Sequence, residues 1–357
     1  MELAFFGFSY LLLLISIFNF FSIRIPRNTE PVTQSVTVLL PVRDEERNIE
    51  DCIRGLKSQV NVPLLRFIII DDQSIDNTAE LARRATKEDS RFSIINSHGP
   101  RPGWLGKVSA LQRGFDAAES DYIITLDADV RLQPSAISLA VNQLEDLTLD
   151  FISPYPRQES GSLIEKLIQP LLHWSWMATV ILRLAEKVPH RSTAVANGQF
   201  FVVRKSALDS IDGFTSVQSK ILDDIEIARS LIAAGHHGVV TEGSAIAQTR
   251  MYRNFNEIKQ GYGKSLHKAF GGAIGATVAI AFVFMTGVLP VILIFLGSPL
   301  GWFVYLTIVS TRALSDIRAK STPIYAILHP VSSLILIYLI IYSWNKRGVI
   351  QWKGRTV

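Results

Sequence analysis

Three apolar runs, each ending in acidic residues, most constrain how this chain can fold. Residues 36–40, 66–70 and 122–126 consist almost entirely of apolar side chains. Uninterrupted runs of this length are typical of strands that are covered on both faces in a parallel sheet. Residues 48–59 and 78–86 lie between them and carry apolar side chains at helical spacing. This alternation predicts right-handed crossovers and an α/β fold with a mainly parallel sheet.

Acidic residues follow all three predicted strands. The sequences after them are Pro41-Val42-Arg43-Asp44-Glu45, Asp71-Asp72-Gln73-Ser74 and Asp127-Ala128-Asp129. Ligands of open parallel sheets bind at the carboxyl ends of the strands. Carboxylates at that edge can hold a hard divalent cation, which could in turn hold a diphosphate. A polar turn would explain one such motif, but three of them together favour a functional site.

Further charged residues with possible chemistry lie elsewhere in the chain. Asp223 and Asp224 open an amphipathic stretch, where one carboxylate could cap a helix and an ionised one could deprotonate an acceptor hydroxyl. Arg250 and Arg253 precede an apolar block. They could neutralise the charge of a diphosphate leaving group, or they could anchor the chain beside a membrane. Lys107 could reach a phosphate, although most lysines are simply exposed.

The first apolar segment predicts a transmembrane helix over residues 1–24. Hydrophobic residues make up 48% of the chain and charged residues 19%, and residues 3–23 carry no charge. At about 1.5 Å per residue this stretch can cross a hydrocarbon core of ~30 Å. It has neither the basic start nor the small-residue cleavage site of a signal peptide. Arg24 and Arg27 flank its far end, so the positive-inside rule predicts a cytoplasmic location for the domain that follows.

The last third of the chain predicts more membrane helices, over residues 269–343. The sequence Gly297-Ser298-Pro299-Leu300-Gly301 predicts a hairpin within this region. Residues 312–320 are expected to form a basic cytoplasmic loop, and residues 323–342 form another candidate span. The basic tail of residues 344–357 favours the inside, whereas four full crossings would leave it outside. One C-terminal segment could therefore be re-entrant or interfacial.

Residues 167–182 form an apolar run of 16 residues, which is short for a span, within a segment predicted over residues 163–186. Trp174 and Trp176 lie near its middle, and they predict an interfacial helix with tryptophans at the lipid headgroups. A buried core helix fits the pattern equally well. A full crossing here would put Asp129 and Asp224 on opposite sides of the membrane, which argues against a span.

Charge and cysteine content exclude some classes of function. The net charge is +4 with scattered lysines and arginines, and no nucleic-acid-binding motif is present. A basic surface beside anionic lipid is the simpler explanation. The single cysteine, Cys52, excludes an intramolecular disulfide and is predicted to be a buried apolar filler.

The motifs, taken in order, resemble glycosyltransferase family 2. The resemblance covers residues 33–255, which form the predicted cytoplasmic domain. It implies the GT-A nucleotide-sugar-binding fold, here with N-terminal and C-terminal transmembrane helices. It also implies inversion of the anomeric centre by a single displacement. The matching positions are residues 41–45, 71–74, 106–107, 127–129, 223–224 and 250–253.

The resemblance also implies roles for individual residues in donor binding. Asp127 and Asp129 match the motif for metal and diphosphate, with Asp129 the direct ligand of Mg²⁺ or Mn²⁺. The nucleotide sugar would be held by a larger set of residues that come from four loops, namely Pro41, Arg43, Asp44, Asp71, Asp72, Lys107 and Asp127.

The residues matched to catalysis depart slightly from the family pattern. Asp224 matches the general base, and Asp223 replaces the Glu that usually precedes it. Arg250 and Arg253 match an Arg-x-x-Arg version of the product-side motif. Asn254 follows them where the family usually has Trp, and this weakens the comparison with processive polysaccharide synthases.

The membrane layout resembles that of enzymes that glycosylate carotenoid acids, hopanoids or ceramide. Residues 103–107 and the tail at residues 348–355 strengthen this resemblance. We therefore expect a glycosyltransferase of the bacterial inner membrane, with a cytoplasmic catalytic domain. It would move one sugar from a UDP-sugar to a lipid. The alternatives are a processive polysaccharide synthase, which needs more spans than this chain offers, and a non-catalytic membrane scaffold or sugar-binding protein, against which the intact acids argue.

Overall fold

The computed structural model describes residues 2–347, 351–352 and 355–356, which form two compact units. The sheet unit comprises Arg24–Arg157 and Leu184–Thr249. The helical unit comprises Met1–Ile23, Gln158–Arg183 and Arg250–Val357. Residues 158–183 and 250–255, which the sequence analysis assigned to the cytoplasmic domain, thus belong to the helical unit.

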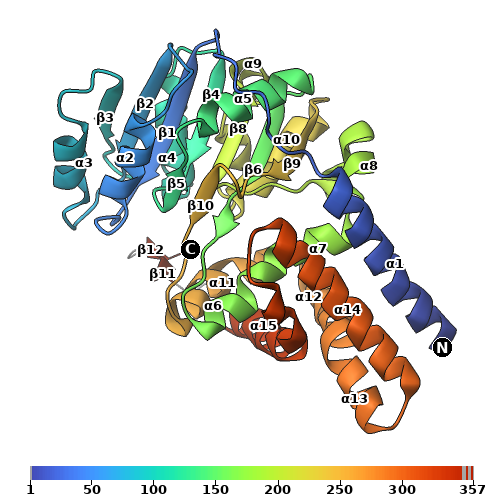
Figure 1. Ribbon diagram of the computed structural model, residues 1–357. Helices are drawn as coiled ribbons and strands as arrows, with labels where there is room; N and C mark the ends of the chain where they lie inside the picture. The colour runs from blue at the N-terminus through green and yellow to red at the C-terminus, as the bar shows by residue number, and fades with distance from the viewer. Residues whose placement is uncertain (1, 348–350, 353–354, 357) are drawn as a thin grey trace. The chain divides into compact units, whose positions relative to one another are not determined.

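A seven-stranded sheet forms the centre of the sheet unit (Figure 1). Its first four strands in space are parallel to one another. β8 runs antiparallel to both of its neighbours, while β6 and β9 are parallel to each other. The sheet is therefore mainly parallel, as predicted, and the three apolar runs are β1, β2 and β4. The spatial order is β3 (Phe92–Asn96), β2 (Leu65–Asp71), β1 (Val36–Val42), β4 (Tyr122–Leu126), β8 (Phe200–Arg204), β6 (Phe151–Tyr155), β9 (Gly238–Glu242).

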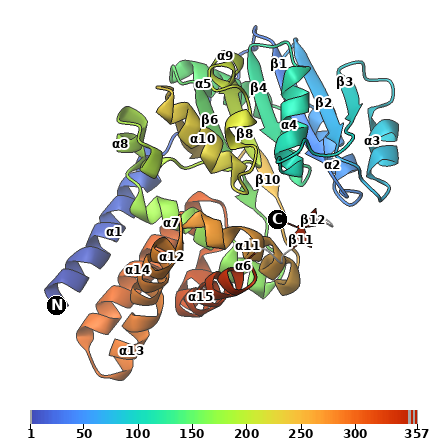
Figure 2. The same cartoon turned by 180° about the vertical axis from the view of Figure 1, so that it is seen from behind.

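Helices bury both faces of this sheet (Figure 2). One apolar core lies under α2 (Ile49–Lys57), α3 (Thr78–Thr86) and α5 (Ala136–Asp146). The other lies under α4 (Gly106–Asp116), α9 (Lys205–Asp209) and α10 (Asp223–Ala233). Each fully buried Leu, Ile or Phe contributes about 1.5–3 kcal/mol to stability. The predicted helices at residues 48–59 and 78–86 are α2 and α3.

Cys52 has the environment that the sequence predicts. It lies on the buried side of α2 with Ile49, Ile53 and Leu56, and burial raises the pKa of its thiol to about 12. A thiol that stays protonated is a poor nucleophile. Cys52 is therefore an apolar filler of the core.

Several short strands and helices lie outside the central sheet and its covering helices. β5 (Val130–Leu132) pairs antiparallel with β10 (Ala247–Thr249), with Val130 opposite Thr249. This register places the end of β10 beside the residue that follows Asp129. The remaining short elements are β7 (Arg157–Gln158), α8 (Leu182–Lys187), η1 (Arg191–Thr193) and η2 (Thr215–Val217).

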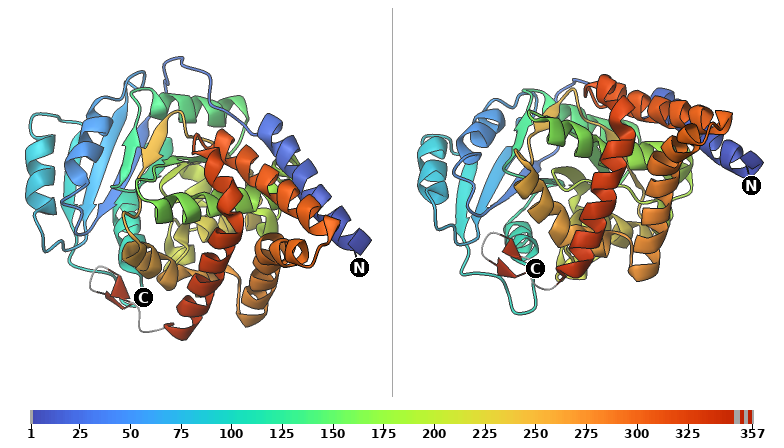
Figure 3. Two further views of the ribbon diagram at one scale, coloured as in Figure 1. Left: turned by 60° about the horizontal axis from the view of Figure 1, so that its bottom comes forward. Right: turned by 90° about the horizontal axis from the view of Figure 1, so that it is seen from below.

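Among its described residues, the helical unit contains three helices that are long and apolar enough to cross a membrane (Figure 3). They are Ala4–Ser22, Ala273–Phe295 and Pro323–Asn345, and they agree with the predicted N-terminal and C-terminal membrane segments. The elements of this unit are α1 (Glu2–Ser22), α6 (Leu163–Ile168), α7 (Pro170–Thr179), α11 (Phe255–Ala269), α12 (Ala273–Val283), η3 (Phe284–Val288), α13 (Leu289–Phe295), α14 (Pro299–Arg318), η4 (Pro323–Leu328) and α15 (His329–Asn345).

The predicted hairpin at residues 297–301 is present, but the predicted basic loop at residues 312–320 is wrong. Gly297 has a φ of 78° and ends the turn after α13, a conformation that glycine adopts without strain. α14 then starts at Pro299 and continues through Arg312 to Arg318. Arg312 and Asp316 are buried, and Arg312 donates to backbone carbonyls of α6. These partners allow a cation to remain inside the helical unit.

The segment at residues 163–186 contains three short helices instead of one. α6 and α7 are separated at Pro170, which has no N–H group for the carbonyl four residues earlier. Trp174 and Trp176 are only 2% and 5% exposed, so they are buried side chains rather than headgroup contacts. A membrane-surface position for the segment as a whole stays a prediction.

Part of the predicted basic tail lies outside the described residues. β11 (Gln351–Trp352) and β12 (Arg355–Thr356) pair antiparallel. Residues 348–350, 353–354 and 357 are not described, so the resemblance of the tail at residues 348–355 stays a prediction.

Candidate active site

The predicted strand-end residues meet at one edge of the central sheet. β1 lies between β2 and β4, and all three strands are parallel. Their carboxyl ends therefore face the same side. Arg43 and Asp44 follow β1, Asp71 and Asp72 close β2, and Asp127 follows β4 directly. This convergence of acids is the grouping that the sequence predicts.

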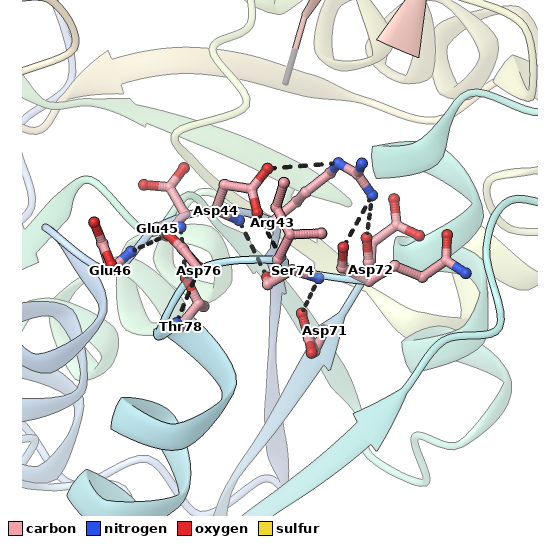
Figure 4. A network of polar contacts seen from close by, with 11 residues as sticks. Arg43, Asp44, Glu45, Glu46, Asp71, Asp72, Ser74, Asp76 and Thr78 are labelled. Carbon is pink, nitrogen blue, oxygen red and sulfur yellow. Dashed lines mark hydrogen bonds and ion pairs between the residues drawn. The ribbon is translucent and has the colours of Figure 1, made fainter. Parts of the chain in front are cut away.

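Arg43 organises the loop after β2 (Figure 4). Its Nη1 donates to the carbonyl oxygens of Asp72 at 2.7 Å and Gln73 at 3.3 Å. Asp44 and Gln73 have φ angles of 50° and 61°, in the left-handed region that non-glycine residues seldom adopt. Such residues cost of order 1–3 kcal/mol and persist where surrounding contacts fix them. The two loops are thus held in one shape beside the strand ends.

The carboxylates of Asp44 and Asp71 are used within the same loops (Figure 4). Asp44 Oδ1 accepts from the backbone N–H of Ile75 at 2.9 Å, and the N–H of Asp44 donates to Ser74 Oγ at 3.1 Å. Asp71 Oδ1 accepts from the N–H of Ser74 at 3.0 Å. These two acids shape the loops, while Asp72 is buried at 3% exposure. Nucleotide binding by Asp44, Asp71 and Asp72 stays a prediction.

Pro41 and Lys107 occupy different kinds of position. Pro41 is a residue of β1 and lies opposite Ile70 of β2. Its predicted part in nucleotide binding stays a prediction. Lys107 lies in the first turn of α4. Its Nζ is 2.8 Å from Asp127 Oδ1 and 3.7 Å from Asp223 Oδ2. Desolvation alone would lower the pKa of Lys107, but the charges of Asp127 and Asp223 outweigh it and raise that pKa.

Asp129 has the environment of a cation ligand. Its Oδ1 is buried and has no hydrogen-bond partner among the described residues. Burial, followed by repulsion from Asp127 and Glu45, raises its pKa to about 7. A buried, unpartnered carboxylate oxygen is costly unless a cation neutralises it. This observation fits the predicted role of Asp129 toward Mg²⁺ or Mn²⁺.

The protein alone offers few ligands to such a cation. Within the described part of the chain, no group of three or more His, Cys, Asp or Glu side chains could hold a metal ion. Mg²⁺ is commonly bound through one or two carboxylates and completed by substrate phosphates and water. Asp127 and Asp129 are two carboxylates one residue apart, and their predicted part in metal binding stays a prediction.

Asp224 lies in the first turn of α10, and both it and Lys107 are close to Gly198. Its Oδ2 accepts from the N–H of Gly198 and its Oδ1 from the N–H of Ile225, both at 2.8 Å. A Cβ at Gly198 would come within 3.1 Å of Asp224 Cβ and 3.4 Å of Lys107 Nζ. Glycine at this position therefore allows the carboxylate and the ammonium to approach the backbone closely.

The electrostatic environment of Asp224 suits a general base. Burial, and then the charge of Asp223, raise its pKa to about 6. A base with a pKa near the operating pH combines ionisation with useful basicity. The N-cap residue of α10 is Leu222, so neither acid occupies that position, but Asp224 Oδ1 accepts from the first-turn N–H of Ile225 and so also satisfies the start of the helix.

The predicted arginines belong to the helical unit. Arg250 Nε and Nη2 donate to Glu165 Oε2 at 3.0 Å and Oε1 at 3.2 Å. Arg253 is exposed, and its backbone N–H donates to Glu257 at 2.8 Å. The predicted roles of Arg250 and Arg253 toward a diphosphate stay predictions.

Sequence reasoning missed Glu165 and Gly161. The sequence Ser162-Leu163-Ile164-Glu165 carries the spacing of a capping box, and that box is present at the start of α6. This signal could have located the start of the helix. It could not have shown that Arg250, far along the chain, pairs with the same carboxylate.

Comparison with known proteins agrees with the geometry. A family model described as Glycosyl transferase family 2 matches residues 37–212. The chain is 25% identical over 256 residues to a 4,4'-diaponeurosporenoate glycosyltransferase of Staphylococcus haemolyticus, covering 69% of this chain and 63% of that protein. The protein of the same name from Staphylococcus aureus is 24% identical over 348 residues, covering 90% of this chain and 88% of its own length.

A third relative has a different product. It is a poly-beta-1,6-N-acetyl-D-glucosamine synthase of Staphylococcus aureus, 27% identical over 204 residues, which cover 57% of this chain and 47% of that synthase. The chain therefore spans less than two thirds of this relative and of the one from Staphylococcus haemolyticus.

A solved structure supports the fold. The mannosyltransferase PcManGT from Pyrobaculum calidifontis, in complex with GDP-Man and Mn2+, matches with a TM-score of 0.58 and 18% identity. The match covers 96% of this chain and 95% of the mannosyltransferase. Together with the order of the strands, this likeness confirms the expected GT-A type of α/β fold.

Proposed function

Because the chain belongs to glycosyl transferase family 2 through residues 37–212, we propose that it transfers a single sugar from a UDP-sugar to a lipid acceptor with inversion at the anomeric carbon. The observation that carries the proposal is that Lys107 pairs with Asp127 and also lies close to Gly198, whose N–H group holds the carboxylate of Asp224. This arrangement brings a candidate base and a candidate diphosphate site close to the same cation. An inverting displacement needs these two groups on opposite sides of the reacting carbon.

The residues divide into two roles in this reaction. Asp224 takes the proton of the acceptor's hydroxyl or carboxyl group, whose oxygen then bonds to the anomeric carbon as the bond from that carbon to the diphosphate breaks. Lys107 and Arg250 neutralise the charge that develops on the departing diphosphate. Gly198 fixes the orientation of Asp224 through its N–H group.

Asp127 and Asp129 are the residues that would hold Mg²⁺ or Mn²⁺. When bound, the ion supplies positive charge to the diphosphate oxygens. The unpartnered Oδ1 of Asp129 supports this assignment.

Two observations support a lipid acceptor at a bacterial membrane. In the part of the chain that the structure describes, three helices are apolar and long enough to span a bilayer. Two relatives are named for glycosylation of a carotenoid acid, 4,4'-diaponeurosporenoate. We place the sheet unit in the cytoplasm, because Arg24 and Arg27 follow the first apolar helix.

The test is an assay of the purified full chain in detergent. It would be incubated with Mn²⁺, a panel of UDP-sugars, GDP-mannose, and either bacterial lipid extracts or soluble sugars, and the products would be identified by mass spectrometry. We expect one sugar on a lipid with the anomeric configuration opposite to that of the donor. Transfer to soluble acceptors alone, or retention of configuration, would contradict the proposal.

A processive polysaccharide synthase is the second candidate, because the relative from Staphylococcus aureus that makes poly-beta-1,6-N-acetyl-D-glucosamine aligns over 204 residues. The same assay distinguishes the two. A ladder of products that lengthens with time on a gel would favour the synthase, whereas a single addition favours the lipid enzyme.

A further inference from the structure

Glu165 is a buried carboxylate of the helical unit, and it belongs to none of the motifs that resemble glycosyltransferase family 2. Its side chain is 0% exposed. Its Oε1 accepts from the N–H of Ser162 at 2.8 Å, and its Oε2 accepts from the N–H of Gly161 at 3.0 Å. The guanidinium of Arg250 donates to both oxygens, at 3.2 and 3.0 Å. Parallel hydrogen bonds of this kind fix the plane of an arginine as well as its position.

Gly161 completes a slot for this guanidinium. A Cβ at Gly161 would lie 2.2 Å from Arg250 Nη2 and 2.8 Å from Arg250 Cζ. Real side-chain atoms do not approach so closely, so only glycine allows the guanidinium to lie against the backbone here. We call Gly161, Ser162 and Glu165 the guanidinium slot.

The helix that carries the slot is fixed at both ends. Ser162 and Glu165 form a capping box at the start of α6. At its other end, Arg312 Nη2 donates to the carbonyl oxygens of Lys166 at 3.2 Å and Leu167 at 2.8 Å. Pro170 has no N–H for the carbonyl of Lys166, and Arg312 takes the place of that donor. A rigid support is what a positioned side chain requires.

The slot leaves one nitrogen of Arg250 available. Glu165 engages Nε and Nη2, and in the part of the chain that the structure describes no hydrogen bond or ion pair engages Nη1. The side chain of Arg250 is 36% exposed. Arg250 directly follows Thr249, which pairs with Val130 in the small sheet, one residue after Asp129. Arg250, the residue that the slot holds, therefore directly follows a strand residue that pairs with the neighbour of Asp129.

We propose that Glu165 is a positioning residue, which fixes the guanidinium of Arg250 and leaves its Nη1 to bind the diphosphate of the donor. The proposal rests on the proposed role of Arg250 toward that diphosphate. Glu165 itself touches no reacting atom. It restricts the rotation of a long side chain, and a positioned cation loses less freedom when charge develops on the leaving group.

A purely structural ion pair would look similar in a static structure, but it makes a different prediction. If Glu165 only stabilises the fold, then loss of Glu165 and loss of Arg250 affect turnover independently or not at all. If Glu165 acts through Arg250, then Glu165→Gln has little further effect once Arg250 is absent. A double-mutant cycle separates these two cases.

The experiment compares the full chain with Glu165→Gln, Arg250→Met and the double variant. Isothermal titration would measure UDP and GDP binding in the presence of Mn²⁺, and initial rates would give kcat and KM for the donor. We expect Glu165→Gln to lower kcat on the order of tenfold to a hundredfold, with a much smaller change in donor KM. The double variant should be no slower than Arg250→Met.

Gly161→Ala provides a second test that leaves both charged residues in place. Its methyl group displaces the guanidinium, so its loss of kcat should resemble that of Glu165→Gln. Glu50→Gln, which removes an exposed ion pair with Arg84 at 2.8 Å, is the matched control and should keep full activity. Thermal unfolding would show whether each variant is folded.

The outcomes separate this proposal from the proposed function. Equal losses from Glu165→Gln with and without Arg250 would overturn the positioning role, as would full activity and unchanged diphosphate binding of Glu165→Gln and Gly161→Ala. If the wild-type chain transfers no sugar, the proposed function fails. A non-additive cycle in diphosphate binding would still support the positioning of Arg250 by Glu165.

Discussion

The ammonium of Lys107 lies 2.8 Å from Asp127 Oδ1, within the group of acids at the strand ends. Asp223 Oδ2 is 3.7 Å from the same nitrogen. Carboxylates that gather this closely repel one another unless a cation lies among them. Lys107 therefore links the motif proposed for the metal to the acids that open α10.

Replacing Lys107 should change metal and diphosphate binding in opposite directions. Lys107→Met removes a cation that competes for Asp127, so Mn²⁺ should bind the nucleotide-free chain about tenfold more tightly, which corresponds to roughly 1.4 kcal/mol. Without metal, UDP should bind about tenfold more weakly, because an ammonium no longer meets the phosphates. Isothermal titration measures both affinities.

Lys205→Met is the control for this variant. Lys205 pairs with Asp209 at 2.9 Å on α9, so the substitution removes an equivalent charge elsewhere. Mn²⁺ affinity that is the same in Lys107→Met and Lys205→Met would show that Lys107 does not compete with the ion.

Asp129 should limit the stability of the metal-free chain. Asp129→Asn removes a buried negative charge whose Oδ1 has no partner in the described residues. The melting temperature without metal should rise by about 2–4 °C for each kcal/mol of relieved repulsion. Mn²⁺ and UDP should then fail to raise it further, whereas they stabilise the wild type by binding its native state.

Thermal scans with and without EDTA would measure this effect. Asp127→Asn is the comparison, since Asp127 is paired with Lys107 and its removal leaves that cation without its nearest partner. An equal gain in melting temperature from both variants, or continued stabilisation of Asp129→Asn by Mn²⁺, would be evidence against Asp129 as the main ligand.

Asp224 should set the acid limb of the pH profile. Its pKa is raised to about 6, and only the ionised carboxylate can accept a proton. kcat/KM should therefore be constant well above pH 6 and fall about tenfold per unit as the pH drops below it. Asp224→Asn should reduce kcat by at least about a thousandfold while UDP binding changes little. A residual rate close to the wild type would exclude Asp224 as the base.

The sequence predicts the fold well because the signals for it are local. The runs at residues 36–40, 66–70 and 122–126 carry enough apolar, β-branched side chains to specify β1, β2 and β4. The predicted hairpin at Gly297 follows from the backbone freedom of glycine, whereas the single helix predicted over residues 163–186 overlooked the break at Pro170. The acids at the strand ends follow from the topology, because parallel neighbours deliver their carboxyl ends to one edge.

What the sequence does not predict depends on contacts between distant residues. Asp71 and Asp72 look alike in the sequence, yet Asp71 closes a turn onto Ser74 while the carbonyl of Asp72 accepts from Arg43. The pairing of Glu165 with Arg250 joins residues 85 positions apart. The burial of Arg312 reverses the prediction of an exposed basic loop, because the partners of that arginine lie on α6.

Arg312 should be essential for stability as long as Asp316 is present. Arg312 Nε is 3.8 Å from Asp316 Oδ2, and the two side chains are 0% and 1% exposed. Arg312→Met leaves Asp316 as a buried, unpaired charge and removes the donor to two carbonyls of α6. Removal of one member of a buried pair typically destabilises by about 3–5 kcal/mol.

The double variant Arg312→Met/Asp316→Leu should recover most of that loss, since replacing a buried ion pair by apolar side chains is often close to neutral. Thermal unfolding in detergent would compare the single and double variants. Recovery should remain incomplete by about 1–2 kcal/mol, because the carbonyls of Lys166 and Leu167 still lack the donor that Arg312 provides. If the double variant is as unstable as Arg312→Met, then Arg312 stabilises the protein mainly by supporting α6, and both variants should lose kcat as Glu165→Gln does.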